Sequence, residues 1–319
     1  MPRIGIVGTG MIASSLAVLT AGHGMETQVF ARSAQSAGRF EASFAAHWQL
    51  MVQNGVATQE QADICATYAR VSTELPALRD AEVVFECIVE DLDQKTDVYR
   101  RLEQTCPSLR AICSVSSSIV PDQLAASCTR YADRIVVTHP FNPVHMVPYV
   151  EVCAAETTDP EVCAYVVELL EALDRKPVVL KKPTPGFIGN RLQFALWREA
   201  LALVEEGVAD PHDIDIALRY SFCPRYTSIG IFEHFDTGGL ALNRATCKNL
   251  FPVLSDRKDV PPVIDSLMEQ GRTGASAGRG FYDWEGVDMG AYAARVNEPY
   301  WKFCSWHMPD APMRPSGEC

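Results

Sequence analysis

The sequence predicts an α/β domain built on a parallel sheet, followed by an all-α domain. Two observations predict this order. Up to residue 180, short β-branched runs alternate with helical stretches, which is typical of a parallel sheet covered by helices. After Lys181-Lys182-Pro-Thr-Pro-Gly186, only helical periodicity remains. We therefore expect domains at residues 1–182 and 183–319.

Each predicted strand is a short run rich in β-branched residues and bounded by turns or helical stretches. The expected strands cover residues 3–7, 27–31, 82–86, 111–114, 135–139, 149–153 and 177–180. Helices are expected between them at residues 92–104 and 159–173, and Asp159-Pro160 is a favourable start for the latter. The second domain should begin with helices at residues 190–206 and 211–220.

The first helix of the second domain has an apolar face. Its apolar residues recur three or four positions apart and include Leu192, Leu196, Ala200 and Leu203. Such a face would pack against a partner. We therefore expect a homodimer that associates through the helical domain.

Composition excludes several classes of function. The chain has 319 residues, of which 47% are apolar and 21% charged, so it can bury a substantial core. Its net charge of −12 disfavours nucleic acid and anionic membranes as partners. No apolar run approaches the roughly 18 residues of a membrane span, and Met1-Pro-Arg leads directly into a strand, so we expect a cytoplasmic protein. The eleven cysteines form no Cys-x-x-Cys pair, which suits reduced thiols rather than a metal site.

A glycine-rich turn follows the first predicted strand and opens a helix. In Gly8-Thr-Gly10-Met11-Ile12-Ala13, Gly8 permits a tight turn and Gly10 removes a side chain where backbone must approach a pyrophosphate. The small Ala13 allows close packing of helix on strand, and the helix N-terminus would face the phosphates. This context predicts a Rossmann-like domain that binds a nicotinamide dinucleotide.

The end of the second strand bears on which nicotinamide cofactor binds. An NAD site usually offers Asp or Glu to the ribose hydroxyls there, but this chain has Ala31-Arg32-Ser33. Arg32 and Ser33 are suited to a 2′-phosphate, so the residues favour NADP without excluding NAD. The alternative is a solvated Arg32 that stacks beside adenine and selects neither cofactor.

His139 and Glu151 lie on neighbouring predicted strands. Imidazole changes protonation near neutral pH, and a carboxylate on its far nitrogen would fix the tautomer and raise its basicity toward an alcohol proton. The alternative is a core histidine whose ring nitrogens are hydrogen-bonded for structural reasons alone, together with a surface glutamate. The other motifs favour an acid/base pair.

Six ordered motifs indicate a family. They are Gly8-Thr-Gly-Met-Ile-Ala13, Val83-Val-Phe-Glu-Cys-Ile-Val-Glu90, Ser114-Val-Ser-Ser-Ser118, His139-Pro-Phe-Asn-Pro143 with Glu151, Pro185-Gly-Phe-Ile-Gly-Asn-Arg-Leu192 and Gly278-Arg-Gly-Phe-Tyr282. Through almost its whole length, the chain resembles the L-3-hydroxyacyl-CoA dehydrogenases. Within that group it looks like the lambda-crystallin or L-gulonate 3-dehydrogenase branch.

The resemblance implies a dehydrogenase and assigns roles. His139 and Glu151 would form the catalytic dyad, Ser117 would lie beside the substrate oxygen, and Asn190 would complete the site from the second domain. Glu86 and Glu90 would belong to loops near the nicotinamide. The alternatives are a loop-capping Ser117, a helix-capping Asn190 and a solvated Glu86 or Glu90.

The substrate is expected to be a small L-3-hydroxy acid, either free or as a thioester. In the family, the helical hairpin after the second strand helps to hold coenzyme A, yet no Lys or Arg occurs here between Arg39 and Arg70. Arg225, in a segment that looks like the lambda-crystallin branch, would clamp a free carboxylate, or else form a salt bridge. The nearby aromatic residues Phe232, His234 and Phe235 are suited to a quaternary ammonium group, so a substrate such as carnitine is an alternative.

Two rival functions remain open at the level of sequence. The first is an L-3-hydroxyacyl-CoA dehydrogenase proper, which a basic patch at the mouth of the cleft would favour. The second is a catalytically silent nucleotide-binding or structural protein of the same fold. The presence of all four residues Ser117, His139, Glu151 and Asn190 argues against the second.

Overall fold

The computed structural model describes residues 1–304, which divide into two compact units. The first unit spans Met1–Ile188 and the second begins at Gly189. The sequence predicts the boundary six residues earlier, after residue 182. Residues 305–319, which belong to the predicted second domain, lie outside the described residues.

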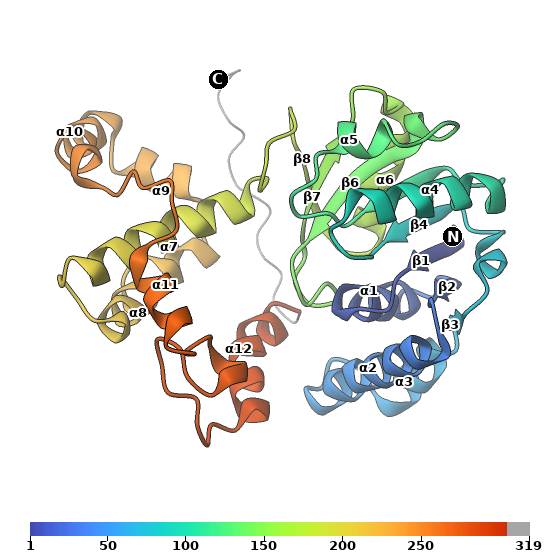
Figure 1. The fold of residues 1–319 in the computed structure, drawn as a ribbon, viewed down its shortest axis with the longest axis horizontal. Helices are drawn as coiled ribbons and strands as arrows, with labels where there is room; N and C mark the ends of the chain where they lie inside the picture. The colour runs from blue at the N-terminus through green and yellow to red at the C-terminus, as the bar shows by residue number, and fades with distance from the viewer. Residues whose placement is uncertain (305–319) are drawn as a thin grey trace. The chain divides into compact units, whose positions relative to one another are not determined.

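The first unit is built on one eight-stranded sheet in the order β3-β2-β1-β4-β5-β6-β7-β8 (Figure 1). Its strands are β1 (Ile4–Val7), β2 (Thr27–Phe30), β3 (Ala69–Ser72), β4 (Val83–Glu86), β5 (Ala111–Ser114), β6 (Ile135–Pro140), β7 (Tyr149–Ala154) and β8 (Lys176–Val179). β1 lies between β2 and β4, so the chain order reverses there. Ligands of open α/β sheets bind at such a point, beyond the carboxyl ends of the strands.

The sheet is parallel except between β6 and β7. Only residues 141–148 connect these two strands, and a parallel crossover needs a dozen residues or more. The expectation of a wholly parallel sheet is therefore wrong at this step. The antiparallel register sets His139 directly opposite Glu151.

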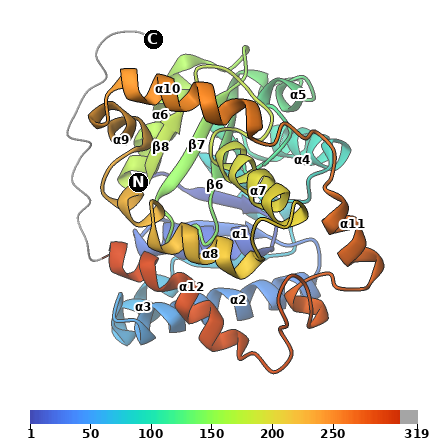
Figure 2. The same cartoon turned by 90° about the vertical axis from the view of Figure 1, so that its left-hand side faces the viewer.

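Helices cover both faces of the sheet, because the buried strands carry apolar side chains on both sides (Figure 1; Figure 2). One face packs against α1 (Met11–Gly22), α2 (Ala34–Gln53), α3 (Gln59–Ala66) and α6 (Pro160–Ala172). The other packs against η1 (Leu75–Leu78), α4 (Leu92–Thr105) and α5 (Pro121–Ala125), with η2 (Ala132–Arg134) leading into β6. The predicted helices at 92–104 and 159–173 correspond to α4 and α6.

Strand β3 has no counterpart among the predicted strands. Its four residues, Ala-Arg-Val-Ser, contain a single β-branched apolar side chain, and the strand lies at the edge of the sheet with its side chains half-buried or exposed. A strand this short and this polar gives a weak periodic signal. Pairing with β2 stabilises it instead.

In the described part of the second unit, residues 189–304, the regular elements are all helices. They are α7 (Gly189–Glu205), α8 (Pro211–Tyr220), η3 (Cys223–Thr227), α9 (Ile231–Thr237), α10 (Leu240–Leu250), η4 (Phe251–Val253), α11 (Pro262–Glu269), η5 (Ala275–Ala277) and α12 (Met289–Cys304). The predicted fold class, a Rossmann-like α/β domain followed by an all-α domain, is confirmed. Among residues 1–304, no helix is both long and apolar enough to cross a bilayer.

Candidate active site

The glycine turn between β1 and α1 leaves a helix N-terminus open. Gly8 has a φ of +120°, and a Cβ there would lie 2.4 Å from the carbonyl oxygen of Cys87. Gly10 precedes α1 as its N-cap, and no atom lies within 4 Å of the position its Cβ would take. Backbone N–H groups at a helix start bind phosphate, so this turn is suited to a dinucleotide.

The residues that follow β2 are placed at the same edge of the sheet. Ala31 is buried, whereas Arg32 is exposed. The Ser33 hydroxyl accepts a hydrogen bond from the backbone N–H of Ser36 at 3.2 Å and so caps α2. A second guanidinium, that of Arg101 on α4, lies 5.6 Å from the ring centroid of Phe30 at the end of β2. Residues 27–33 therefore carry no carboxylate of their own, and two guanidinium groups lie nearby, of which that of Arg101 also forms an ion pair with Asp97 at 3.8 Å.

One polar side chain near the turn was not singled out from the sequence. Asn142, in the loop after β6, donates from its amide nitrogen to the sulfur of Met11 at 3.1 Å. Met11 is 63% exposed, and Ile12 beside it packs against the core. Asn142 thus lies between the glycine turn and the strand of His139. Its signal in the sequence is a polar residue between Phe141 and a proline, directly after that strand.

His139 and Glu151 form a buried hydrogen-bonded pair. Imidazole Nδ1 lies 2.7 Å from Oε2 of Glu151, whose side chain is fully buried. The other oxygen, Oε1, accepts from the Tyr149 hydroxyl at 3.1 Å and from the Ile188 N–H at 2.6 Å. Burial and the Glu151 charge raise the pKa of Tyr149, which therefore stays a donor. Both carboxylate oxygens thus have hydrogen-bond partners.

This arrangement sets the tautomer of His139. An ionised carboxylate accepts hydrogen bonds but cannot donate them, so the imidazole proton is assigned to Nδ1 and the lone pair to Nε2. Aromatic rings line the imidazole, with the centroids of Phe141 and Phe187 at 5.4 and 5.3 Å. These rings exclude water from the pair, which strengthens its electrostatic interaction.

The loop after β5 is held by Glu90. Glu90 Oε1 accepts from the Ser116 hydroxyl at 2.6 Å, from the Ser117 N–H at 3.0 Å and from the Ser118 N–H and hydroxyl, both at 2.9 Å. Burial pushes the pKa of Glu90 upward, but the hydrogen bonds from Ser116 and Ser118 and the Lys95 charge outweigh it and lower the pKa to about 2. Glu90 therefore remains an acceptor at neutral pH.

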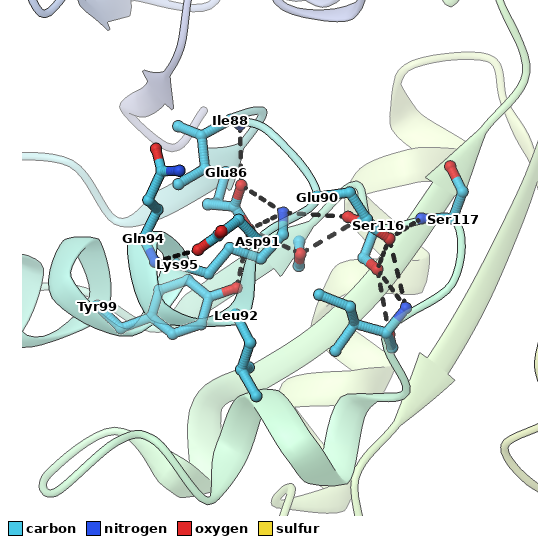
Figure 3. A network of polar contacts seen from close by, with 12 residues as sticks. Glu86, Ile88, Glu90, Asp91, Leu92, Gln94, Lys95, Tyr99, Ser116 and Ser117 are labelled. Carbon is cyan, nitrogen blue, oxygen red and sulfur yellow. Dashed lines mark hydrogen bonds and ion pairs between the residues drawn. The ribbon is translucent and has the colours of Figure 1, made fainter.

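Ser117 differs from its two neighbours. Figure 3 shows its hydroxyl pointing away from Glu90, whereas the hydroxyls of Ser116 and Ser118 donate to that carboxylate. Because β5 and β6 are parallel neighbours, the loop that carries Ser117 follows the strand beside that of His139. Of the three serines, Ser117 is the one whose hydroxyl is not used to hold the loop.

Two predicted site residues belong to the second unit. Asn190 lies in the first turn of α7, and Arg225 lies exposed in η3. The ring centroid of His234 lies 6.1 Å from that of Tyr226 and 5.2 Å from that of Phe235. Phe232, predicted as part of an aromatic group, is 88% exposed.

Two family models match the chain. The NAD binding domain of 3-hydroxyacyl-CoA dehydrogenase matches residues 3–183, and the C-terminal domain of the same family matches residues 186–284. The two models thus match residues in both units.

Individual relatives agree with this match. The 5-formyl-3-hydroxy-2-methylpyridine 4-carboxylate 5-dehydrogenase of Mesorhizobium japonicum is 34% identical over 206 residues, which cover 65% of this chain and 66% of that enzyme, just under two thirds of its length. The L-carnitine dehydrogenase of Pseudomonas putida is 30% identical over 280 residues, covering 86% of this chain and 84% of that enzyme. A crystal structure of a 5-formyl-3-hydroxy-2-methylpyridine 4-carboxylic acid 5-dehydrogenase, described as an NAD+ dependent dismutase, superposes with a TM-score of 0.86 at 27% identity, covering 95% of this chain and 97% of that one.

Proposed function

Because the chain belongs to the 3-hydroxyacyl-CoA dehydrogenase family, we propose that it transfers a hydride reversibly between a nicotinamide cofactor and C3 of an L-3-hydroxy acid. The family resemblance carried by the sequence motifs is confirmed, and the relatives are dehydrogenases. The observation that carries the proposal is the buried pair of His139 and Glu151. It lies at the carboxyl edge of the sheet, where the glycine turn also lies.

The proposed mechanism follows from the hydrogen bonds of the pair. Glu151 holds Nδ1–H of His139, so Nε2 takes the hydroxyl proton during oxidation, and the buried carboxylate stabilises the imidazolium that results. A bound nicotinamide would supply the hydride acceptor as C3 is oxidised to a carbonyl. For Ser117, we propose a hydrogen bond from its hydroxyl to the oxygen on which charge develops. In the reductive direction, His139 returns the proton.

For the cofactor, we propose a preference for NADP over NAD. The support is the pair of guanidinium groups at the end of β2, Arg32 and Arg101, and the absence of a carboxylate between Thr27 and Ser33. Guanidinium groups form bidentate, charge-assisted hydrogen bonds with phosphate. The capping role of Ser33 leaves Arg32 as the main candidate for the 2′-phosphate contact.

Replacing Arg32 tests this preference. We expect Arg32→Ala to weaken NADPH binding by about 10- to 100-fold and to leave NADH binding nearly unchanged, because a hydrogen bond to a charged group contributes about 1.5–3 kcal/mol. The measurement is the dissociation constant of each reduced cofactor by fluorescence titration. Arg39→Ala, which removes another exposed arginine of the same region, is the matched control. An equal loss for both cofactors would show that Arg32 does not select between them.

For the substrate, we propose a free carboxylate rather than a coenzyme A thioester. No Lys or Arg occurs between Arg39 and Arg70, the stretch that includes most of α2 and all of α3, so this hairpin offers no cation to the phosphates of coenzyme A. Arg225 is exposed and available to a carboxylate. The contacting rings of Tyr226, His234 and Phe235 add a surface suited to a quaternary ammonium, so L-carnitine belongs among the substrates tested.

Steady-state kinetics tests this choice. We expect kcat/KM to favour free L-3-hydroxy acids, L-gulonate and L-carnitine among them, over (S)-3-hydroxybutyryl-CoA. Arg225→Met should lower kcat/KM for the free acid by about 10- to 100-fold through KM, because it removes a charge-assisted contact with the carboxylate. Arg219→Met, at an exposed arginine of α8, is the control. A preference of the wild type for the thioester, or an unchanged KM in Arg225→Met, would contradict the proposal.

We also propose that the protein acts as a cytoplasmic homodimer that associates through the second unit. The support is the surface of α7, where Leu192, Phe194, Leu196 and Trp197 are each at least 42% exposed. Exposed apolar side chains gathered along one helix favour a protein partner over solvent.

A further inference from the structure

A fully buried carboxylate at the end of β4 accepts hydrogen bonds from α4, from β5 and from the loop that follows β4 (Figure 3). The two oxygens of Glu86 lie 2.8 and 2.9 Å from Nζ of Lys95. Oε2 also accepts from the hydroxyls of Tyr99 and Ser114, both at 2.8 Å, and Oε1 accepts from the Ile88 N–H at 2.9 Å. Glu86 thus connects β4, α4 and β5 at the edge of the sheet that carries the candidate site.

Fold stability alone is a weak explanation for this ion pair. Both Glu86 and Lys95 are 0% exposed. The free energy needed to remove two charges from water offsets much of the free energy gained from their attraction. Apolar residues of similar volume often serve a core equally well or better. Burial and the Glu86 charge also raise the pKa of Tyr99, so its hydroxyl remains a donor. A network this complete fixes geometry more than it adds stability.

The network continues from Lys95 toward the loop of Ser117. Nζ of Lys95 lies 3.5 Å from Oε2 of Glu90. The other oxygen of Glu90 accepts the backbone N–H groups of Ser117 and Ser118 at 3.0 and 2.9 Å and that of Ile119 at 3.3 Å. Lys95 therefore joins two carboxylates, one fixed in the core and one that holds the loop.

We propose that Glu86 is a positioning residue, which holds Lys95 and through it Glu90, so that the loop of residues 116–119 presents the Ser117 hydroxyl in a fixed place. The inference rests on the proposed function, because it assigns Ser117 a contact with the substrate oxygen. The effect of Glu86 on the loop can be tested independently of the proposed function, because the ordering of the loop can be measured without any substrate.

A variant that removes both charges together avoids leaving one of them unpaired. Glu86→Gln/Lys95→Met keeps the approximate volume and creates no isolated buried charge. Lys95→Met alone would leave the Glu86 carboxylate without its cation, and Glu86→Gln alone would leave Lys95 with only its 3.5 Å contact to Glu90. We expect the double variant to fold, with the backbone amides of residues 117–119 exchanging at least about 10-fold faster with deuterium. We expect kcat to fall about 100-fold with KM nearly unchanged, because a small displacement of a reacting group costs this much.

Glu103 offers a matched control on α4, the helix that also carries Lys95. It is buried like Glu86, and its Oε1 accepts the backbone N–H groups of Thr129, Arg130 and Tyr131 at 2.9, 2.7 and 3.0 Å. That loop precedes the amino end of β6, opposite the edge of the candidate site. Glu103→Gln should speed exchange at residues 129–131 and lower the melting temperature, while kcat and the exchange of residues 117–119 stay unchanged.

The outcomes separate this inference from the proposed function. A folded double variant with wild-type exchange at residues 117–119, or one with faster exchange and unchanged kcat, would overturn the positioning role. If the wild type oxidises no 3-hydroxy acid with either cofactor, the proposed function fails, and the exchange experiment alone decides whether Glu86 orders the loop.

Discussion

Replacing His139 with glutamine is expected to abolish turnover by orders of magnitude while cofactor binding survives. A positioned general base contributes typically about 10²- to 10⁴-fold to rate, and glutamine cannot take a proton from the substrate. The glycine turn and the end of β2, where the cofactor is proposed to bind, belong to other elements and should be unaffected. The measurements are kcat in both directions and the dissociation constant of the reduced cofactor.

Tyr149→Phe is the matched control for this experiment. It removes one hydrogen bond to Oε1 of Glu151 but keeps the Ile188 N–H on that oxygen and His139 on the other. A single neutral hydrogen bond contributes about 1 kcal/mol, so we expect less than about a 10-fold loss in kcat. An active His139→Gln variant would remove His139 from the mechanism. A variant that loses activity and cofactor binding together would point to misfolding, which the melting temperature would reveal.

The sequence predicts the sheet better than it predicts the site. Most strands are buried on both faces, so they stand out as β-branched runs, and the confirmed fold class follows from them. The antiparallel step at β7 depends on the short length of residues 141–148, a constraint that periodicity does not express. Periodicity also gives no signal for β3, whose side chains are mostly polar or partly exposed.

The sequence predicts that His139 and Glu151 lie on neighbouring strands, but whether they face each other depends on the register of those strands. Other contacts in the candidate site leave no pattern in the local sequence. Glu90 holds Ser117 from a distance of 27 residues along the chain, so no spacing rule connects them. Nor does the run Ser116-Ser117-Ser118 reveal which hydroxyl is uncommitted, because that depends on how the loop folds around Glu90. The network centred on Glu86 has the same origin: tertiary packing brings its donors together.

Alanine at Gly8 should lower the stability of the fold, whereas alanine at Gly10 should lower the affinity for the cofactor. At Gly8, a Cβ would lie 2.4 Å from a backbone oxygen, and the φ of +120° is one that L side chains rarely adopt. Backbone strain of this kind costs about 1–3 kcal/mol and the clash adds to it, so Gly8→Ala should lower the free energy of unfolding by about 3 kcal/mol or more. Denaturant unfolding of the cofactor-free protein measures this loss.

At Gly10, by contrast, a Cβ meets no atom within 4 Å, and the backbone before α1 is extended, so Gly10→Ala should keep the unfolding free energy within about 0.5 kcal/mol of the wild type. The space it fills is the one through which a pyrophosphate would approach the helix N-terminus. Cofactor affinity should therefore fall by at least about 10-fold in a protein that is otherwise intact. Wild-type affinity in Gly10→Ala would mean that the cofactor does not approach α1 at this turn, and the proposed binding site would have to be abandoned even if Gly8→Ala unfolds as expected.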